Sequence, residues 1–259
     1  MKNNFISILI TNYNKEKFLK KNLKQICNQK FKNYEILLHD DHSTDNSIAI
    51  IKKYKKIRLI QNFNKKKNSG PLNQISGIFK IFKMSKGNII CLLDADDYFF
   101  KNKLSKIDHF FNKNKNINCV FDMPKNDLND FKLKNKKDKN FIWPTIFPTS
   151  CVSVRKNFFK QFIEYSEKNK FDCLEIDARI TIFSKFFFNE YNIINQSLTK
   201  YNYDPKGITA NIKKFSSKWW SRRYQAHLYL KILLKKKNKI FKPGIDFYVT
   251  SFFNLFHRR

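Results

Sequence analysis

The first hundred residues alternate between short apolar runs and longer segments in which apolar residues recur every three or four positions. The apolar runs predict four strands, at 5–11, 34–39, 57–61 and 88–93. The segments between them predict three helices, at 15–28, 45–54 and 72–84. Strands that alternate with helices of this length form βαβ units, so we expect an α/β fold with a mostly parallel, Rossmann-like sheet flanked by helices.

Polar residues follow three of these predicted strands. The first leads into Thr11-Asn12-Tyr13, the second into Asp40-Asp41-His42, and the fourth into Asp94-Ala95-Asp96-Asp97. In a parallel sheet, ligands bind outside the carboxyl ends of the strands. Carboxylate oxygens are ligands that Mg²⁺ or Mn²⁺ prefer. A solvated turn that caps the next helix would also explain Asp94–Asp97, but the convergence of three polar strand ends favours a metal-assisted site.

The second half has a less regular pattern. Residues 112–140 are rich in Lys, Asn and Asp, which predicts a loop or irregular insertion. A strand is expected at 150–154, a helix at 175–187 and a strongly basic helix at 215–235. We expect one domain over 1–210, with a regular first part at 1–110 and a less regular second part at 111–210. Residues 211–259 would form a basic helical C-terminal extension.

Charge and cysteine content limit the partners. The chain has 52 Lys and Arg against 21 Asp and Glu, a net charge of +31. This excess indicates anionic partners, namely nucleic acid, phosphate-bearing substrates or an acidic membrane. A biased genome is another explanation for the positive charge, because the chain is rich in Lys, Asn, Ile and Phe, which all have AT-rich codons. The five cysteines are widely spaced, which argues against a zinc site or a disulfide framework and favours the reducing cytoplasm. Residues 1–10 lack the long apolar region of a signal peptide, and no stretch of about 18 apolar residues is present to span a bilayer.

Three ordered motifs resemble those of the inverting GT-A nucleotide-sugar glycosyltransferases, glycosyltransferase family 2. They are the start of the chain at 6–14, the segment Asp-Asp-His-Ser-Thr-Asp at 40–45, and Leu-Asp-Ala-Asp-Asp at 93–97. The resemblance covers 5–105 well. It departs from the family pattern where the chain has His42 for a glycine, Gln74 for an arginine, and Asn202 and Asp204 for an arginine and a histidine. Lys65, Lys66 or Lys67 could supply the charge that Gln74 lacks.

The resemblance implies a hexosyltransferase that moves a sugar from a nucleotide diphosphate sugar, a UDP-sugar being favoured, to a glycan or lipid-linked acceptor. The pathway implied is bacterial surface polysaccharide or lipopolysaccharide synthesis. The family places Asp96 on the metal, Asp94 near both metal and ribose, and Asp41 on the base. The nucleotide-sugar pocket would be completed by Thr11, Asn12, Tyr13, Gln74 and Ala95.

The resemblance also requires a catalytic base at a helix start about eighty residues after the metal motif. Glu175 and Asp177 are the candidates there. Asp177 is favoured, with Glu175 as the fallback. The structural alternative for Asp177 is a carboxylate that complements the dipole of the helix N-terminus.

Two aromatic and basic segments suggest contact with a membrane. Trp219-Trp220 lies next to Arg222-Arg223, and the tail 247–259 mixes Phe and Leu with His257, Arg258 and Arg259. These features support a peripheral contact with an anionic membrane at the inner face of the cell membrane. For Trp219-Trp220, the favoured interpretation is instead that one tryptophan packs in the core and the charges are solvated.

Two other functions explain less of the sequence. A metal-dependent nucleotidyltransferase would carry a glycine-rich loop after the first strand, and residues 12–16 contain no glycine. A basic protein that binds nucleic acid or membrane without catalysis would leave the carboxylates unexplained. No nucleic-acid-binding motif is visible, so no nucleic acid partner is expected.

Overall fold

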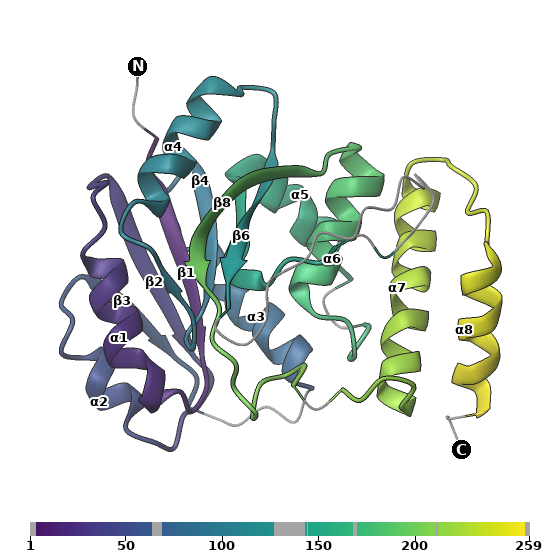
Figure 1. Ribbon diagram of the computed structural model, residues 1–259, viewed down its shortest axis with the longest axis horizontal. Helices are drawn as coiled ribbons and strands as arrows, with labels where there is room; N and C mark the ends of the chain where they lie inside the picture. Colours follow the sequence, from purple (N-terminus) through teal and green to yellow (C-terminus); the bar gives the residue numbers. More distant parts are fainter. Residues whose placement is uncertain are drawn as a thin grey trace.

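The computed structural model describes residues 4–63, 69–126, 143, 145–167, 170–210 and 212–256. Within these residues, the strands form one sheet in the order β3-β2-β1-β4-β7-β6-β8-β5. Helices cover both faces of this sheet (Figure 1). The predicted α/β architecture is therefore confirmed.

The first half follows the predicted alternation. The strands are β1 (Ile6–Asn12), β2 (Tyr34–Asp40), β3 (Ile57–Gln61) and β4 (Ile89–Asp94), and they pair in parallel. The helices are α1 (Glu16–Cys27), α2 (Ser47–Ile51), α3 (Gly70–Phe82) and α4 (Lys103–Lys113). The β1 register sets Thr11 beside Asp94 and Asn12 beside Asp40, so the three polar strand ends meet at one edge.

Burial on both faces of the sheet explains the continuous apolar runs. In β1, Ile8 and Ile10 pack with α1, α2 and α4, whereas Leu9 faces the core formed with α3 and the later helices. Strands covered on both sides lose the usual alternation of apolar and polar residues. At Gly77 in α3, a Cβ atom would lie 2.5 Å from Nδ1 of His39, so glycine is needed where this helix approaches β2.

The second half adds antiparallel pairs. Its strands are β5 (Tyr98–Phe99), β6 (Cys119–Lys125), β7 (Val152–Arg155) and β8 (Asn192–Lys200). β7 runs antiparallel to β4 and β6, whereas β8 is parallel to β6 and antiparallel to β5. The loop predicted for 112–140 is wrong over β6, which is a buried strand. Residues 127–140 lie outside the described part of the chain.

The remaining helices cover the second half of the sheet and extend beyond it. They are η1 (Thr149–Cys151), α5 (Lys156–Tyr165), α6 (Ile176–Ile182), the π-helix η2 (Phe183–Phe188), α7 (Ser217–Lys236) and α8 (Ile245–Phe256). The helix predicted at 175–187 thus changes to π geometry at Phe183. In Figure 1, α7 and α8 lie antiparallel at one end of the molecule, which confirms the helical C-terminal region. Among the described residues, none of the helices has the length and apolar character needed to span a bilayer.

Candidate active site

A cavity of about 1050 Å³ opens at the carboxyl ends of β1, β2 and β4 and extends to the starts of α6 and α7. All of the site residues predicted from the sequence line it: Thr11, Asn12, Tyr13, Asp41, Gln74, Asp94, Ala95, Asp96, Glu175 and Asp177. Segments more than eighty residues apart along the chain therefore meet at a single concave surface.

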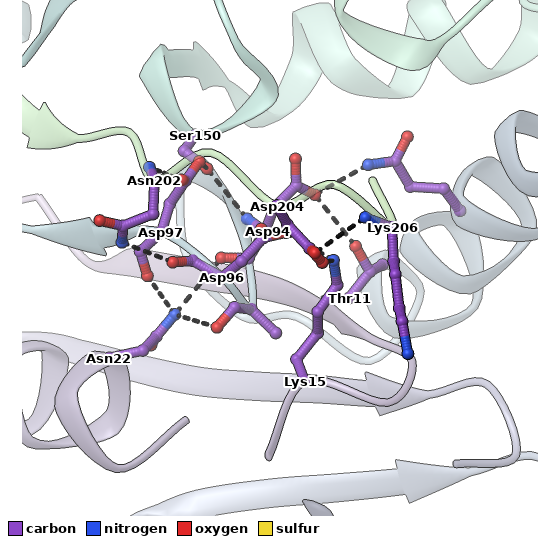
Figure 2. A network of polar contacts seen from close by, with 12 residues as sticks. Thr11, Lys15, Asn22, Asp94, Asp96, Asp97, Ser150, Asn202, Asp204 and Lys206 are labelled. Atoms are coloured by element: carbon purple, nitrogen blue, oxygen red, sulfur yellow. Dashed lines mark hydrogen bonds and ion pairs between the residues drawn. The ribbon is translucent and has the colours of Figure 1, made fainter. Parts of the chain in front are cut away.

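Asp94 lies at the end of β4 and receives hydrogen bonds from two neighbouring elements (Figure 2). Its Oδ1 accepts from Nε2 of Gln74 at 2.8 Å and from Oγ1 of Thr11 at 3.3 Å. Burial raises the pKa of Asp94 to about 6, and the nearby charge of Asp96 adds to the shift. Gln74, which stands where the family has an arginine, thus orients this carboxylate with a neutral amide.

Asp97 supports the cluster from inside the protein. Its Oδ2 accepts from Oγ of Ser150 at 2.6 Å, and its Oδ1 accepts from the backbone N–H of Asn202 at 2.8 Å. Burial, reinforced by the charges of Asp96 and Asp94, raises its pKa well above the usual range. Since both carboxylate oxygens already have protein partners, Asp97 joins strand ends rather than facing the cavity.

The backbone of the Asp94–Asp97 turn is held by α1. The Nδ2 of Asn22 donates to the carbonyl oxygens of Asp94, Ala95 and Asp97. Asn22 is buried within α1, so the turn is positioned by a neighbouring helix as well as by its own strand. This contact fixes the direction in which the Asp94 and Asp96 side chains leave the sheet.

Asp96 projects toward a lysine that sequence reasoning missed. The Nζ of Lys15 donates to Oδ2 of Asp96 at 2.6 Å and also contacts Oδ2 of Asp204. Burial alone would lower the pKa of Lys15, but the charge of Asp96 and the bonds to both carboxylates outweigh it, so the pKa is raised. Lys15 lies three residues after the end of β1, but no motif marks it, so its contact with Asp96 becomes visible only in the structure.

The carboxylates have the chemistry required for a divalent cation. Side-chain oxygens of Asp94, Asp96 and Asp97 lie within 4.8 Å of one another. Asp94 and Asp96 also line the cavity, and Lys15 forms an ion pair with Asp96. Hard oxygen donors of this type suit Mg²⁺ or Mn²⁺.

A fully buried ion pair lies behind the acidic turn. The Nζ of Lys103 in α4 donates to Oδ1 of Asp122 at 2.6 Å, to the carbonyl of Ser150 at 2.7 Å and to Oγ1 of Thr199 at 2.7 Å. This pairing explains how Asp122 can lie in the buried strand β6. Because Ser150 bonds both to this lysine and to Asp97, the ion pair also braces the site.

The second strand end forms a tight turn beside the cavity. Asp40 accepts from the backbone N–H of Ser43 at 2.9 Å and from Nδ2 of Asn12 at 2.6 Å. His42 has a φ of 63°, so it takes the left-handed conformation expected where the family has glycine. Asp41 lines the cavity and accepts from Nδ2 of Asn62 at 2.8 Å. Lys65, Lys66 and Lys67 lie outside the described residues.

Glu175 and Asp177 line the cavity from the start of α6. Glu175 is buried, and its Oε2 accepts from Nε of Arg222 at 2.5 Å. Burial raises the pKa of Asp177 to about 7, with the charge of Glu175 as the next contributor, whereas Arg222 lowers it. Asp177 is therefore poised to exchange a proton near neutral pH.

The start of α7 contributes cavity residues that the sequence interpretation had assigned to other roles. Trp219, Arg222 and Arg223 line the cavity with Trp143. The guanidinium groups of Arg222 and Arg223 lie 5.3 and 5.1 Å from the centre of the Trp143 ring. Trp220 is buried instead, so the interpretation that one tryptophan packs in the core is confirmed.

The family model for glycosyl transferase family 2 matches residues 7–173. The chain belongs to this family. A UDP-Glc:α-D-GlcNAc-diphosphoundecaprenol β-1,3-glucosyltransferase of Escherichia coli is 35% identical over 112 residues, which cover 42% of this chain and 42% of that protein. The chain spans less than half the length of several curated relatives that it matches.

Solved structures share the fold at low sequence identity. Staphylococcus aureus TarS 1–349 in complex with UDP-GlcNAc has a TM-score of 0.65 and 13% identity, and the match covers 98% of this chain and 71% of that one. A mannosyltransferase of Pyrobaculum calidifontis in complex with GDP-Man and Mn²⁺ has a TM-score of 0.57 and 11% identity, with 99% and 70% covered. These likenesses establish the GT-A architecture of the chain.

Proposed function

We propose that the protein transfers a hexose from a nucleotide diphosphate sugar, a UDP-sugar being favoured, to a glycan or lipid-linked acceptor, with inversion at the anomeric carbon. One observation carries the proposal: the cavity is lined by Asp94 and Asp96 on one side and by Asp177 on another. Residues 1–110 would bind the donor, and residues 111–210, together with the start of α7, would bind the acceptor.

The relatives support the substrate classes. The Escherichia coli protein is named for UDP-Glc and for an acceptor carried on diphosphoundecaprenol, which is a lipid. The TarS structure contains UDP-GlcNAc, and the mannosyltransferase structure contains GDP-Man with Mn²⁺. We extend these substrate classes to this chain and place the reaction in bacterial surface polysaccharide synthesis. A lipid-linked acceptor also requires a peripheral contact with the inner face of the cell membrane.

Inversion needs one in-line displacement. The acceptor hydroxyl oxygen forms a bond to the anomeric carbon while the bond from that carbon to the diphosphate oxygen breaks. The carboxylate of Asp177 takes the hydroxyl proton, and the nucleoside diphosphate leaves with the bonding electron pair. A pKa of about 7 suits this role because a general base is most effective near the working pH.

The donor side of the cavity would stabilise the leaving group. Asp96 and Asp94 would hold Mg²⁺ or Mn²⁺, which offsets the negative charge of the diphosphate. Asp41 would accept a hydrogen bond from the base, and Thr11, Asn12 and Tyr13 would line the nucleoside pocket. Lys15 lies close enough to Asp96 to add a second positive charge on this side.

A binding experiment tests this proposal before any acceptor is known. We expect a panel of UDP- and GDP-sugars to raise the melting temperature of the protein only when Mn²⁺ or Mg²⁺ is present. Asp96→Ala should abolish the metal-dependent part of the shift, whereas the matched change Asp172→Ala, at an exposed position away from the cavity, should preserve it. If no donor gives a metal-dependent response in the wild-type protein, the proposal is wrong.

A further inference from the structure

The helix α8 packs Phe247 and Phe253 on aromatic rings of α7, but it also buries two polar side chains and leaves a larger apolar stripe exposed. Thr250 and Asn254 are buried against α7, and Asn254 accepts from Oγ of Ser221 at 3.0 Å. Asp246 of α8 pairs with Arg223 and with His227, both of which lie on α7. The opposite side, which we name the α8 outer face, has exposed fractions from 41% to 83% and consists of Ile245, Tyr248, Val249, Phe252, Leu255 and Phe256. A helix of a soluble domain normally buries its apolar stripe, so this exposed stripe indicates a binding surface.

An aromatic path joins the α8 outer face to the cavity. The ring centres of Phe252 and Phe253 are 5.4 Å apart, Phe253 stacks on Trp220 at 4.6 Å, and Trp220 lies 4.6 Å from Trp219. Trp219 lines the cavity. A chain of aromatic contacts, with Trp220 buried within it, therefore links α8 to the side of the cavity where we place the acceptor.

The charge around this surface selects the kind of partner. Between residues 205 and 256 the sequence has twelve Lys and Arg and a single acidic residue, Asp246, which is already paired. Exposed lysines lie in the last turn of α7 and in the connection to α8, at Lys235, Lys239 and Lys242. Cations beside exposed Phe, Leu and Tyr are typical of helices that lie on anionic lipid. A second copy of the chain would bring the same positive charges together, which disfavours self-association.

We infer that the α8 outer face docks on an anionic lipid bilayer, with α8 lying in the interface and Lys235, Lys239 and Lys242 contacting lipid headgroups. The aromatic path then leads from the bilayer surface to the acceptor side of the cavity. The inference identifies the surface responsible for the proposed membrane contact and rests on that part of the proposed function. It does not depend on the donor or on the base.

Vesicle flotation tests the inference with the full chain. We expect binding to phosphatidylcholine vesicles that contain phosphatidylglycerol, and weak or no binding to pure phosphatidylcholine. The double change F252S/L255S should lower the binding constant by about tenfold or more, because two large apolar side chains no longer enter the interface. The matched change Phe63→Ser removes a well-exposed phenylalanine beyond β3 and should leave binding unchanged.

The charge contribution needs its own pair of variants. K235E/K239E/K242E should remove the preference for phosphatidylglycerol, whereas K17E/K20E/K24E reverses three exposed charges on α1 and should reduce binding much less. Equal binding to both kinds of vesicle, or F252S/L255S binding like the wild type, would overturn the inference. The inference would also be overturned if the wild-type protein formed a dimer in lipid-free buffer and F252S/L255S were a monomer, because the α8 outer face would then bind a second copy of the chain.

The donor assay separates this inference from the proposed reaction. All variants should retain the far-UV circular dichroism spectrum and the metal-dependent thermal response to nucleotide sugars, which shows that they fold. Vesicle binding without any donor response would contradict the proposed reaction and leave the docking surface standing. A donor response with no vesicle binding would contradict the docking surface and leave the proposed reaction standing.

Discussion

The two acidic groups of the cavity are supported in different ways. The Asp94–Asp97 turn is held by neutral donors from several elements, among them Asn22, Gln74 and Ser150, with Lys15 as the cation that contacts Asp96. The Glu175–Asp177 pair depends instead on Arg222 of α7. The first group lies inside the region that the family model matches, and the second lies just beyond it. The Asp94–Asp97 turn therefore lies within the matched family region, whereas Glu175 pairs with a residue of α7 outside that region.

The same contrast appears in the proton affinities. Burial raises the pKa of Asp94 to about 6 and that of Asp177 to about 7, and a neighbouring carboxylate adds to each shift. Hydrogen bonds from Gln74 and Thr11 favour the ionised form of Asp94. For Asp177, the charge of Arg222 and a hydrogen bond from the backbone N–H of Ala178 at 2.6 Å have this effect. The two carboxylates thus share the cause of their raised pKa and differ in the partners that oppose it.

Replacing Asp177 should give the largest effect and separates the two groups by function. With Asp177→Asn, we expect the transfer rate to fall by about 10²–10⁴-fold, because the acceptor proton has no base to receive it. Donor binding should remain, since the Asp94–Asp97 turn is unchanged. Single-turnover kinetics beside a nucleotide-sugar titration measures both quantities. Full transfer by this variant would show that the base is another residue, with Glu175 the first alternative.

Breaking the buried ion pair should destabilise the donor side. Lys103→Met leaves Asp122 as an uncompensated buried carboxylate, which costs about 3–5 kcal/mol in the free energy of unfolding. Urea denaturation measures the loss. Lys106→Met is the control, because Lys106 is an exposed residue of the same helix and should change stability little. Equal stability of the two variants would mean that the ion pair does not brace the site.

Replacing Glu175 should produce the smallest and most specific change. The Glu175 charge raises the pKa of Asp177, so Glu175→Gln lowers it. Because the base must be ionised, wild-type transfer should decline as the pH falls through about 7. In the variant this acidic limb should move to lower pH. The pH dependence of kcat measures the shift. A variant that has lost transfer at every pH would identify Glu175 as the base instead.

How much of the fold could be predicted depended on where the polar residues lie. The strands of the first half are continuous apolar runs, and turns follow them directly, so their pattern was unambiguous. β6 was missed because it contains Asp122 and Pro124 in a segment surrounded by Lys and Asn. Contacts with Lys103, nineteen residues earlier, and with Thr199 of β8 make that aspartate compatible with burial. A pattern along the chain does not reveal a charge partner from another element.

The site shows the same division. Asp94 and Asp96 could be proposed as cavity residues from an ordered motif, and Glu175 and Asp177 from the spacing that the family resemblance implies; all four line the cavity. Lys15, Asp204, Trp143 and Arg222 could not, since each belongs to the cavity only through its approach to another segment. The α8 outer face was equally hidden, because its apolar residues resemble a core-facing stripe until α7 is seen to contact the polar side.

The sequence by itself determined the order of strands and helices in the first hundred residues, the acidic strand ends and the family resemblance, since these follow from local periodicity and short motifs. The tertiary structure alone decided which charges neutralise one another and which face of α8 remains exposed. Burial and Coulomb interactions depend on distances between segments far apart in the chain, and those distances exist only after folding.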